Sequence, residues 1–217
     1  MFKRRIGITQ RVIKHKSYNE FMDCLDLNWA NLLISLEILP IPLPLTKAAI
    51  VPKTWKSLKL DGIIFSGGNT LAEYSDHNDI PENISPERDL FEMALIEEAL
   101  STKTAILGVC RGLQLINIFF NGKLKRISGH AGTRHSLIKE ESSYKFDLPS
   151  EVNSFHDFVV PKKLLGKGLT PLAYDNDGNI EAFYNQENKV IGIMWHPERE
   201  KIFFKSDCAL IKNHFGI

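Results

Sequence analysis

Short apolar runs alternate with amphipathic stretches through the first half of the chain. Runs of strand length occupy residues 4–9, 38–43, 63–65 and 104–110, and the last run is apolar almost throughout. Continuous apolar character indicates strands that are buried on both faces, as in a parallel sheet flanked by helices. The pattern therefore predicts βαβ units built around a mainly parallel sheet.

Helices are expected between these strands, and two of them have start signals. Ser17 and Glu20 have the spacing of a capping box, and apolar residues recur at helical spacing from Phe21 onwards. Ser85 precedes a proline, which favours the first position of a helix. One face of that second helix is expected to carry Leu90, Phe91, Ala94, Leu95 and Ala99.

The second half of the chain consists mainly of short strand-like pieces, with a turn signal at Asp177-Gly178 and a final helix from about Phe203. No repeat or linker divides the sequence, so we expect a single domain over residues 1–217. Its predicted architecture is a three-layer αβα arrangement with a mainly parallel central sheet and short extra antiparallel strands. The strand-like pieces are residues 123–127, 144–148, 158–161, 172–175, 180–185 and 189–195.

The composition excludes several classes of protein. Hydrophobic residues make up 43% and charged residues 24% of the 217 positions, as in an ordinary globular domain. The net charge of +1 provides no overall field for attracting nucleic acid or an anionic membrane surface. The longest apolar stretch, residues 32–45, contains a glutamate and several prolines, so it is not expected to cross a bilayer as a helix.

The cysteines and the amino-terminal residues indicate a location in the cell. Cys24, Cys110 and Cys208 are far apart, which fits neither a disulfide framework nor a structural zinc site. The first residues are basic but are not followed by the apolar segment of a signal peptide. We therefore expect a soluble cytoplasmic protein that acts without nucleic acid or membrane partners. A homodimer is compatible with these features.

The most informative segment is Gly108-Val109-Cys110-Arg111-Gly112, between a predicted buried strand and a predicted helix. Glycines on both sides permit a sharp turn, so the central side chain can project from the end of the strand, as in a nucleophile elbow. The N-terminus of a helix favours thiolate over thiol, and we expect the Arg111 side chain to add to this effect. Cys110 is therefore a candidate nucleophile, and a small buried cysteine is the alternative interpretation.

Two further motifs follow predicted strands. In Trp195-His196-Pro197-Glu198 the histidine and the carboxylate are two positions apart on extended chain, so both side chains point to the same side. Glu198 can then orient the imidazole while His196 serves Cys110 as a base. In Ser66-Gly67-Gly68-Asn69 the paired glycines can direct backbone N–H groups at a developing oxyanion. Taken singly, a packing histidine and a simple turn are the alternatives.

In order, position and residue type, these motifs resemble the class I glutamine amidotransferase-like family. Within it, the resemblance points to the free-standing γ-glutamyl hydrolase branch, which is peptidase family C26. It extends over nearly the whole chain. The sequences that carry it are IGITQR, FSGGN, GVCRGLQLIN, GHAGTRH, VNSFH and WHPE.

The resemblance implies a flavodoxin-like fold and a Cys-His-Glu triad. In this family a cysteine attacks the γ-carbonyl of a glutamine-like substrate and forms a γ-glutamyl thioester, without a cofactor. Carried over to this chain, Cys110 is the nucleophile, His196 is the general acid and base, and Glu198 is the carboxylate that orients it. The backbone N–H groups of Gly68 and Arg111 would form the oxyanion hole.

The resemblance also assigns residues to the glutamyl end of a small γ-glutamyl substrate. Gln114 lies one helical turn after the nucleophile, where the family contacts the α-amino acid group of the substrate. The VNSFH segment lies where the backbone and a serine help to hold the same group. The residues concerned in that segment are Ser154, Phe155 and His156.

The leaving-group pocket cannot be copied from relatives, because residues 69–85 are particular to this chain. The loops expected at the carboxyl ends of the strands are rich in basic residues, which suit an anionic leaving group such as a phosphate-bearing amide or a nucleotide. Solvated loop charges are the alternative. We place Asn69, Arg134 and His135 among the substrate-binding residues. His130 and His135 are five positions apart, but no third ligand accompanies them, so no metal site is expected.

Three functions are compatible with the sequence. The first is a free-standing hydrolase that cleaves a γ-glutamyl amide, favoured because a single domain leaves no room for a synthetase. The second is a glutaminase subunit that delivers ammonia to a separate synthetase. The third is a non-catalytic binding module, which the presence of Cys110, His196 and Glu198 together disfavours.

Overall fold

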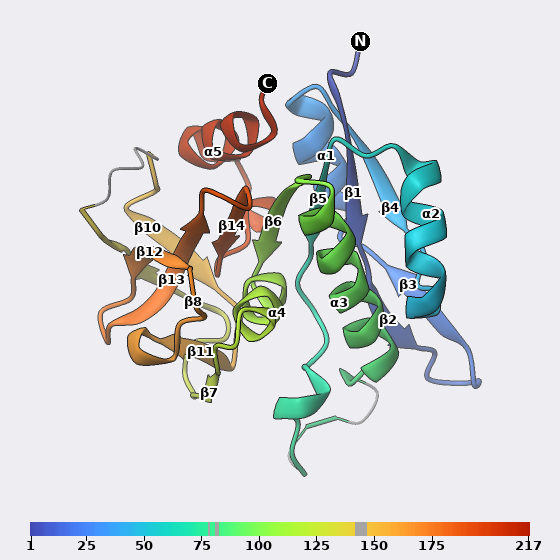
Figure 1. Cartoon of the computed structure of the whole chain (residues 1–217). Coiled ribbons are helices and arrows are strands. Elements are labelled where there is room, and N and C mark those ends of the chain that lie inside the picture. The colour runs from blue at the N-terminus through green and yellow to red at the C-terminus, as the bar shows by residue number, and fades with distance from the viewer. Residues whose placement is uncertain (78, 81–82, 142–146) are drawn as a thin grey trace.

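In the computed structural model a ten-stranded sheet runs through the middle of the protein (Figure 1). The structure describes residues 1–77, 79–80, 83–141 and 147–217. The parallel side of the sheet has the strand order β4 (Ile38–Leu43), β1 (Arg4–Thr9), β5 (Gly62–Phe65), β6 (Ala105–Val109) and β14 (Val190–Ile193). The antiparallel side continues through β13 (Asn179–Asn185), β11 (Phe158–Pro161) and β7 (Lys125–Arg126), with β12 (Thr170–Tyr174) beside β13 and β9 (Ile138–Lys139) beside β12.

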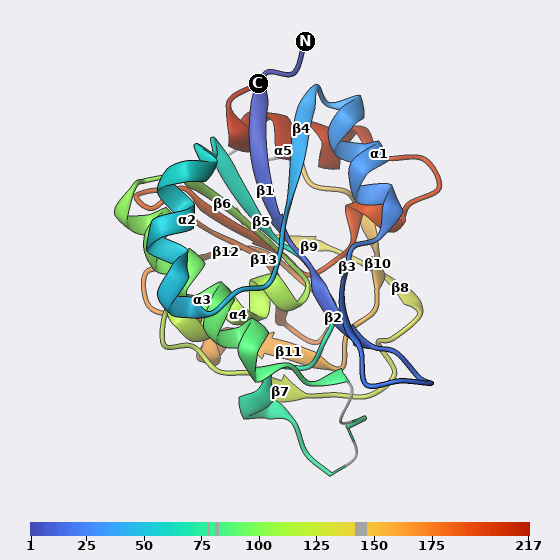
Figure 2. The ribbon, with the colours of Figure 1, turned by 90° about the vertical axis from the view of Figure 1, so that its right-hand side faces the viewer.

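Helices cover both faces of the sheet (Figure 2). The helices α1 (Leu27–Ser35) and α5 (Lys205–Phe215) lie on one face, and α2 (Val51–Leu58), α3 (Pro86–Ser101) and α4 (Arg111–Phe119) lie on the other. Successive residues of β5 point to opposite layers, because Ile64 packs with α1 and α5 whereas Ile63 and Phe65 pack with the other three helices. This arrangement confirms the predicted three-layer fold. None of the helices in the described ranges has both the length and the apolar character that crossing a bilayer requires.

The parallel register brings the three sequence motifs to one edge of the sheet. Phe65 lies beside Gly108, and Ile193 lies beside Val109. The chain therefore leaves β5, β6 and β14 at the same level, and the motifs that follow these strands begin as neighbours. This is the carboxyl edge of the parallel strands, where doubly wound proteins bind their ligands.

The segment after β1 differs from the prediction. Instead of a capped helix, it forms a hairpin of β2 (Arg11–Lys14) and β3 (Phe21–Cys24). The N–H of His15 donates to the carbonyl of Glu20 at 2.8 Å, so the expected capping box is part of the hairpin turn. The cap of α1 is Asp26, whose carboxylate accepts a backbone N–H of the first helical turn. The apolar residues from Phe21 onwards were therefore misread as one helix, because they belong first to β3 and then to α1.

Most of the other expected elements are confirmed, with two differences. Helix α2 was not predicted, and a separate two-stranded sheet is formed by β8 (Thr133–Ser136) and β10 (Glu151–Ser154). Residues 144–146 of the predicted strand at 144–148 lie outside the described residues. The small β8–β10 sheet contributes two of the segments that the sequence analysis placed at the site.

Helix α3 begins as predicted and buries Phe91, Leu95 and Ala99 as expected, but Leu90 lies outside the buried face. The Ser85 hydroxyl accepts the N–H of Arg88 and caps the helix. Leu90 is 65% exposed, whereas Leu95 is 2% exposed. The expectation for Leu90 was wrong because Arg88 and Glu92 are buried. A residue two positions from each of them lies on the opposite side of the helix.

A pair of leucine substitutions tests this assignment. We expect Leu95→Ala to lower the free energy of unfolding by about 2–5 kcal/mol, because it leaves a cavity in the core. Leu90→Ala is the matched control and should change the same quantity by no more than about 0.5 kcal/mol. Urea unfolding of the two variants measures both values. Equal losses in the two variants would show that the buried face is misassigned.

Candidate active site

Cys110 occupies a strained turn between β6 and α4. Its backbone has φ 53° and ψ −106°, in the half of conformational space that L-residues rarely adopt. A Cβ atom on Gly112 would lie 2.0 Å from the carbonyl oxygen of Phe65, so only glycine lets α4 pack this close to β5. The thiol-bearing residue is 6% exposed. This is the geometry expected of a nucleophile elbow.

His196 and Glu198 form a buried pair after β14. The Nδ1 atom of His196 lies 2.7 Å from Oε1 of Glu198, and both residues are almost fully buried. The side chain of Asn153 fixes the backbone of His196 from β10. It accepts the N–H of His196 at 2.9 Å and donates to the carbonyl of His196 at 2.8 Å. The imidazole is thus oriented through both its ring and its backbone.

The imidazole of His196 shares a narrow space with Cys110. A Cβ atom placed on Gly67 would lie 2.7 Å from Cε1 of His196, 3.5 Å from its Nε2 and 3.6 Å from Cβ of Cys110. Burial lowers the pKa of His196, but the neighbouring Cys110 and Glu198 outweigh this effect and raise the pKa to about 9. The arrangement therefore favours the imidazolium form of His196 beside Cys110 at neutral pH.

Arg88 holds the loop that follows β5. Its guanidinium is buried and donates to the carbonyl oxygens of Ser66 at 3.0 Å, Gly67 at 3.2 Å and Gly68 at 2.7 Å. Because C=O and N–H point in opposite directions across a trans peptide, the N–H of Gly68 is directed away from Arg88. The hydrogen bonds of the described residues give neither this N–H nor that of Arg111 an acceptor.

A buried carboxylate joins this loop to the cysteine turn. Glu92 accepts from Arg88 at 2.9 Å and is paired with Arg111, which also contacts Asp89. Burial alone would raise the pKa of Glu92, but the two guanidinium groups hold it below its ordinary value. The Arg111 guanidinium is paired with Glu92 and Asp89, so its expected effect on the thiol stays a prediction.

The predicted residues for the glutamyl end gather near the triad. The Phe155 ring packs edge-on against His196, with 5.8 Å between the ring centroids. The amide of Gln114 donates to the carbonyl of Phe158 at 3.2 Å, and Nδ1 of His156 lies 3.0 Å from the same oxygen. The Ser154 hydroxyl is buried and has no hydrogen-bond partner among the described residues.

Asn69 and Arg134 are engaged in internal contacts. The Asn69 side chain accepts the N–H of Val12 at 2.8 Å and donates to its carbonyl at 2.9 Å, which ties the loop to the hairpin. Arg134 pairs with Glu151 at 2.6 Å and with Glu200 at 2.9 Å. Substrate binding by these two side chains stays a prediction, and both already have structural roles.

His135 lies in a cluster that the sequence analysis did not anticipate. Ligand atoms of His130, His135 and His156 all lie within 4.8 Å of one another, and Glu181 is 3.7 Å from two of these histidines. No metal site was expected, because the sequence shows no third ligand beside His130 and His135. His156, which follows β10, and Glu181 on β13 supply further donors, which only the fold brings together.

Several site residues were missed by the sequence analysis. Arg88 and Glu92 are four positions apart on α3, a spacing that places two side chains on one helix face and could have indicated a pair. For Asn153 and Glu181 no local signal exists, because their partners are distant in sequence.

The closeness of His196 to Cys110 predicts that the reactivity of the thiol depends on pH. Because the pKa of His196 is raised to about 9, the imidazolium beside Cys110 is present below that pH and lost above it. We expect Glu198→Gln to lower the pKa of His196, so that the rate of Cys110 alkylation by iodoacetamide changes at a lower pH than in the parent protein. The measurement is the alkylation rate against pH in a Cys24→Ser, Cys208→Ser background. Glu20→Gln is the control, and identical profiles for all three proteins would contradict the coupling.

Comparisons with known proteins show which families and proteins the chain is similar to. The chain matches the peptidase C26 family model over residues 5–198. A γ-glutamyl-CDP-amidate hydrolase of Campylobacter jejuni is 36% identical over 212 residues, which cover 98% of each chain. A γ-glutamyl-γ-aminobutyrate hydrolase of Escherichia coli is 30% identical over 199 residues, or 78% of this chain and 76% of that one.

Solved structures support the fold. A glutamine amidotransferase from Thermotoga maritima superposes with a TM-score of 0.63 at 17% identity, over 98% of this chain and 84% of its own. A glutamine amidotransferase from Methylobacillus flagellatus gives a TM-score of 0.60 at 16% identity, over 97% and 76% of the two chains. From the family match and the identity along nearly the full length, the chain belongs to the peptidase C26 family and is a hydrolase of C–N bonds.

Proposed function

We propose that the protein hydrolyses the γ-glutamyl amide bond of a small substrate through a γ-glutamyl thioester on Cys110. The observation that carries the proposal is the buried His196–Glu198 pair, at 2.7 Å, beside a cysteine held in a strained turn. The similarity to two γ-glutamyl amide hydrolases supports the same bond as the target. We place the reaction in the cytoplasm, in line with the unpaired cysteines.

The proposed reaction has two steps. The Cys110 thiolate attacks the γ-carbonyl carbon, and the resulting oxyanion accepts hydrogen bonds from the N–H groups of Gly68 and Arg111. His196 gives its proton to the leaving nitrogen as the C–N bond breaks. It then takes a proton from water, whose oxygen attacks the thioester carbon. The products are glutamate, the released amine or amidate, and free Cys110.

The glutamyl end is held by the segment after β10 in this proposal. The unpartnered hydroxyl of Ser154 and the backbone around Phe155 offer hydrogen bonds to the α-amino acid group. Gln114, in the first turn of α4, is proposed to contact the same group. Phe155 lies next to His196, because its ring packs against the imidazole.

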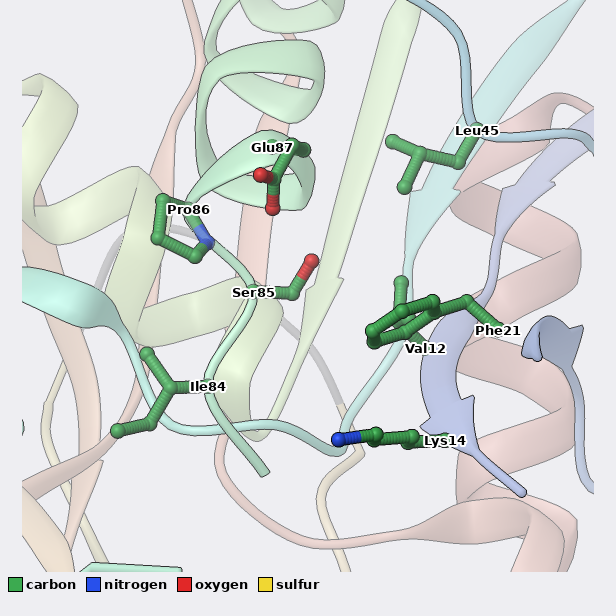
Figure 3. Close-up of a pocket in the computed structure, with 8 residues that line it drawn as sticks. All are labelled: Val12, Lys14, Phe21, Leu45, Ile84, Ser85, Pro86 and Glu87. Carbon is green, nitrogen blue, oxygen red and sulfur yellow. The ribbon is translucent and has the colours of Figure 1, made fainter. Parts of the chain in front are cut away.

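A cavity of about 520 Å³ lies next to the oxyanion loop and is proposed to take the leaving group. Its wall includes Val12, whose backbone N–H and carbonyl oxygen both form hydrogen bonds with the side chain of Asn69. Figure 3 shows the Phe21 ring facing Ser85 across the cavity, with the Lys14 amine beneath them. The volume falls within the usual range for small-molecule sites. The lining residues are Val12, Lys14, Phe21, Leu45, Ile84, Ser85, Pro86 and Glu87.

The chemistry of this cavity favours a nucleotide leaving group. The Phe21 ring is a stacking surface for a base, and Lys14, whose amine lies 5.9 Å from the centroid of that ring, supplies a positive charge for a phosphate. We therefore propose γ-glutamyl-CDP-amidate as the substrate. Hydrolysis gives glutamate and cytidine diphosphoramidate, a donor for capsule phosphoramidate synthesis. The identity of 36% to the C. jejuni enzyme over 98% of both chains supports this choice.

A panel of substrates tests the proposal. We expect glutamate release from γ-glutamyl-CDP-amidate with a kcat/KM at least tenfold above that for γ-glutamyl-γ-aminobutyrate or glutamine. Cys110→Ala should abolish release from every substrate. A nucleotide amide no better than the aminobutyrate amide would reject the leaving group. Unchanged activity in Cys110→Ala would reject the nucleophile, and glutamine turnover that requires a partner protein would favour a glutaminase subunit.

Arg88→Lys tests the hydrogen bonds that hold the oxyanion loop. A lysine keeps the charge, but it lacks the planar guanidinium fork that bonds the three carbonyl oxygens and Glu92 together, so the N–H groups lose their alignment. We expect kcat to fall about 100-fold, with KM changed only a few-fold. Arg4→Lys is the matched control, because Arg4 also bonds carbonyl oxygens, those of Phe215 and Gly216, far from the carboxyl edge. A kcat unchanged in Arg88→Lys, with both variants folded by circular dichroism, would contradict this role.

A further inference from the structure

Glu181 is a buried carboxylate without a hydrogen-bond donor. It lies on β13, its residue is 0% exposed, and neither of its oxygens has a hydrogen-bond partner among the described residues. A carboxylate removed from water in this way is strongly disfavoured unless a cation or a set of donors compensates it. The rings of His135 and His156 lie close to this carboxylate. The Nε2 atom of each ring is 3.7 Å from an oxygen of Glu181. That separation is too long for a hydrogen bond.

Three histidines direct unpartnered nitrogens toward the same place. The atoms Nε2 of His135, Nε2 of His156 and Nδ1 of His130 are buried and have no hydrogen-bond partner in the described ranges. The rings of His130 and His156 are 5.3 Å apart between centroids, and those of His130 and His135 are 5.8 Å apart. Together with Glu181, these residues present five unpartnered polar atoms to one another.

The second nitrogen of two of these rings is oriented as in metal-binding histidines. Nδ1 of His156 lies 3.0 Å from the carbonyl oxygen of Phe158, and Nδ1 of His135 lies 3.3 Å from that of Ser136. A carbonyl can only accept, so Nδ1 carries the proton and Nε2 keeps its lone pair. Metal-ligating histidines commonly donate their other N–H to a carbonyl in this manner.

The spacing of these atoms suits a tetrahedral ion. Ligand atoms about 2.0–2.1 Å from Zn²⁺ are about 3.3 Å from one another in a tetrahedron. The two distances to Glu181 are 3.7 Å, and the histidine nitrogens lie within 4.8 Å of one another. The Nε2 atoms of His135 and His156 approach different oxygens of Glu181, Oε2 and Oε1, so a tetrahedral site requires the carboxylate to turn one oxygen toward the three nitrogens.

Asp175, a neighbouring acidic residue, is less suited than Glu181 to bind a metal ion. Asp175 also lies within 4.8 Å of a His130 ligand atom. Its carboxylate, however, already accepts the N–H groups of Asp177 and Asn179 at 2.9 and 2.8 Å and the amide of Asn179 at 2.8 Å. Asp175 therefore stabilises a turn, whereas Glu181 has no such bonds.

We propose that His130, His135, His156 and Glu181 form a binding site for a divalent transition-metal ion, with Zn²⁺ preferred. Three imidazoles and one carboxylate suit Zn²⁺ and disfavour the hard cations Mg²⁺ and Ca²⁺, which prefer oxygen ligands. Four protein ligands fill a tetrahedral shell, so the ion has a structural role.

The ion would join parts of the fold that are separate in the sequence. His130 precedes β8, His135 lies on β8, His156 follows β10, and Glu181 belongs to the central sheet. The metal thus fastens the small β8–β10 sheet to β13. It also fixes the residue next to Phe155, whose ring contacts His196. Binding at this site does not require the reaction proposed for Cys110.

Metal analysis of the purified protein tests the proposal. A Cys24→Ser, Cys110→Ser, Cys208→Ser protein avoids metal binding by thiols. It is stripped with EDTA, dialysed and titrated with ZnCl₂ against a chromogenic chelator. We expect one Zn²⁺ per chain with a Kd below the micromolar range, not displaced by millimolar Mg²⁺. His130→Ala, His156→Ala and Glu181→Gln should each weaken binding at least tenfold, while His15→Ala, on the hairpin turn, should not.

A second measurement identifies the ligands of the metal without relying on variants. X-ray absorption of the zinc-loaded parent protein should show a shell of four nitrogen and oxygen ligands, with imidazole scattering from three histidines. Failure to bind one Zn²⁺ per chain, equal binding by the cluster variants, or fewer than three imidazoles would overturn the site. Metal binding without hydrolysis by the wild-type protein would reject the proposed function alone. Hydrolysis without metal binding would reject only the metal site.

Discussion

The strained backbone at Cys110 is the constraint on which the site depends. A non-glycine residue in this conformation costs on the order of 1–3 kcal/mol, so the surrounding structure must hold it in place. The N–H of Cys110 bonds the carbonyl of Ile193, and its own carbonyl accepts the N–H of Gln114, at 2.8 and 3.1 Å. Gly112 allows the following helix to press against β5. The thiol-bearing residue is thereby fixed where β5, β6 and β14 end together.

Buried charges extend this constraint to the neighbouring loop. Glu92 lies between Arg88 and Arg111, so one carboxylate connects the loop after β5 with the helix that begins at the cysteine turn. Breaking one member of such a buried group costs about 3–5 kcal/mol, because the others are left uncompensated. The two N–H groups proposed to stabilise the oxyanion therefore belong to segments that are held relative to each other. Asn153 gives the backbone of His196 a comparable anchor.

The sequence predicted the parts of the molecule that have local signals. Buried apolar runs gave the parallel strands, and the Gly-x-Cys-x-Gly and His-x-Glu motifs led to Cys110 and His196 because their chemistry depends on neighbouring residues. The hairpin before α1 was misread because Ser17 and Glu20 mimic a helix cap while their backbone closes a turn. Buried polar contacts between distant segments, such as the Glu181 cluster, leave no pattern along the chain. Their existence depends on which strands become neighbours.

The proposed reaction depends on the transfer of a glutamyl group to Cys110. The most direct measurement is intact-protein and peptide mass spectrometry after acid quenching a few milliseconds into the reaction with γ-glutamyl-CDP-amidate. We expect a mass increase of one glutamyl group on the peptide that contains Cys110. The adduct should be sensitive to hydroxylamine and absent from Cys110→Ala. Glutamate release at full rate with no acylated peptide in wild-type protein, or with the adduct on another residue, would contradict it.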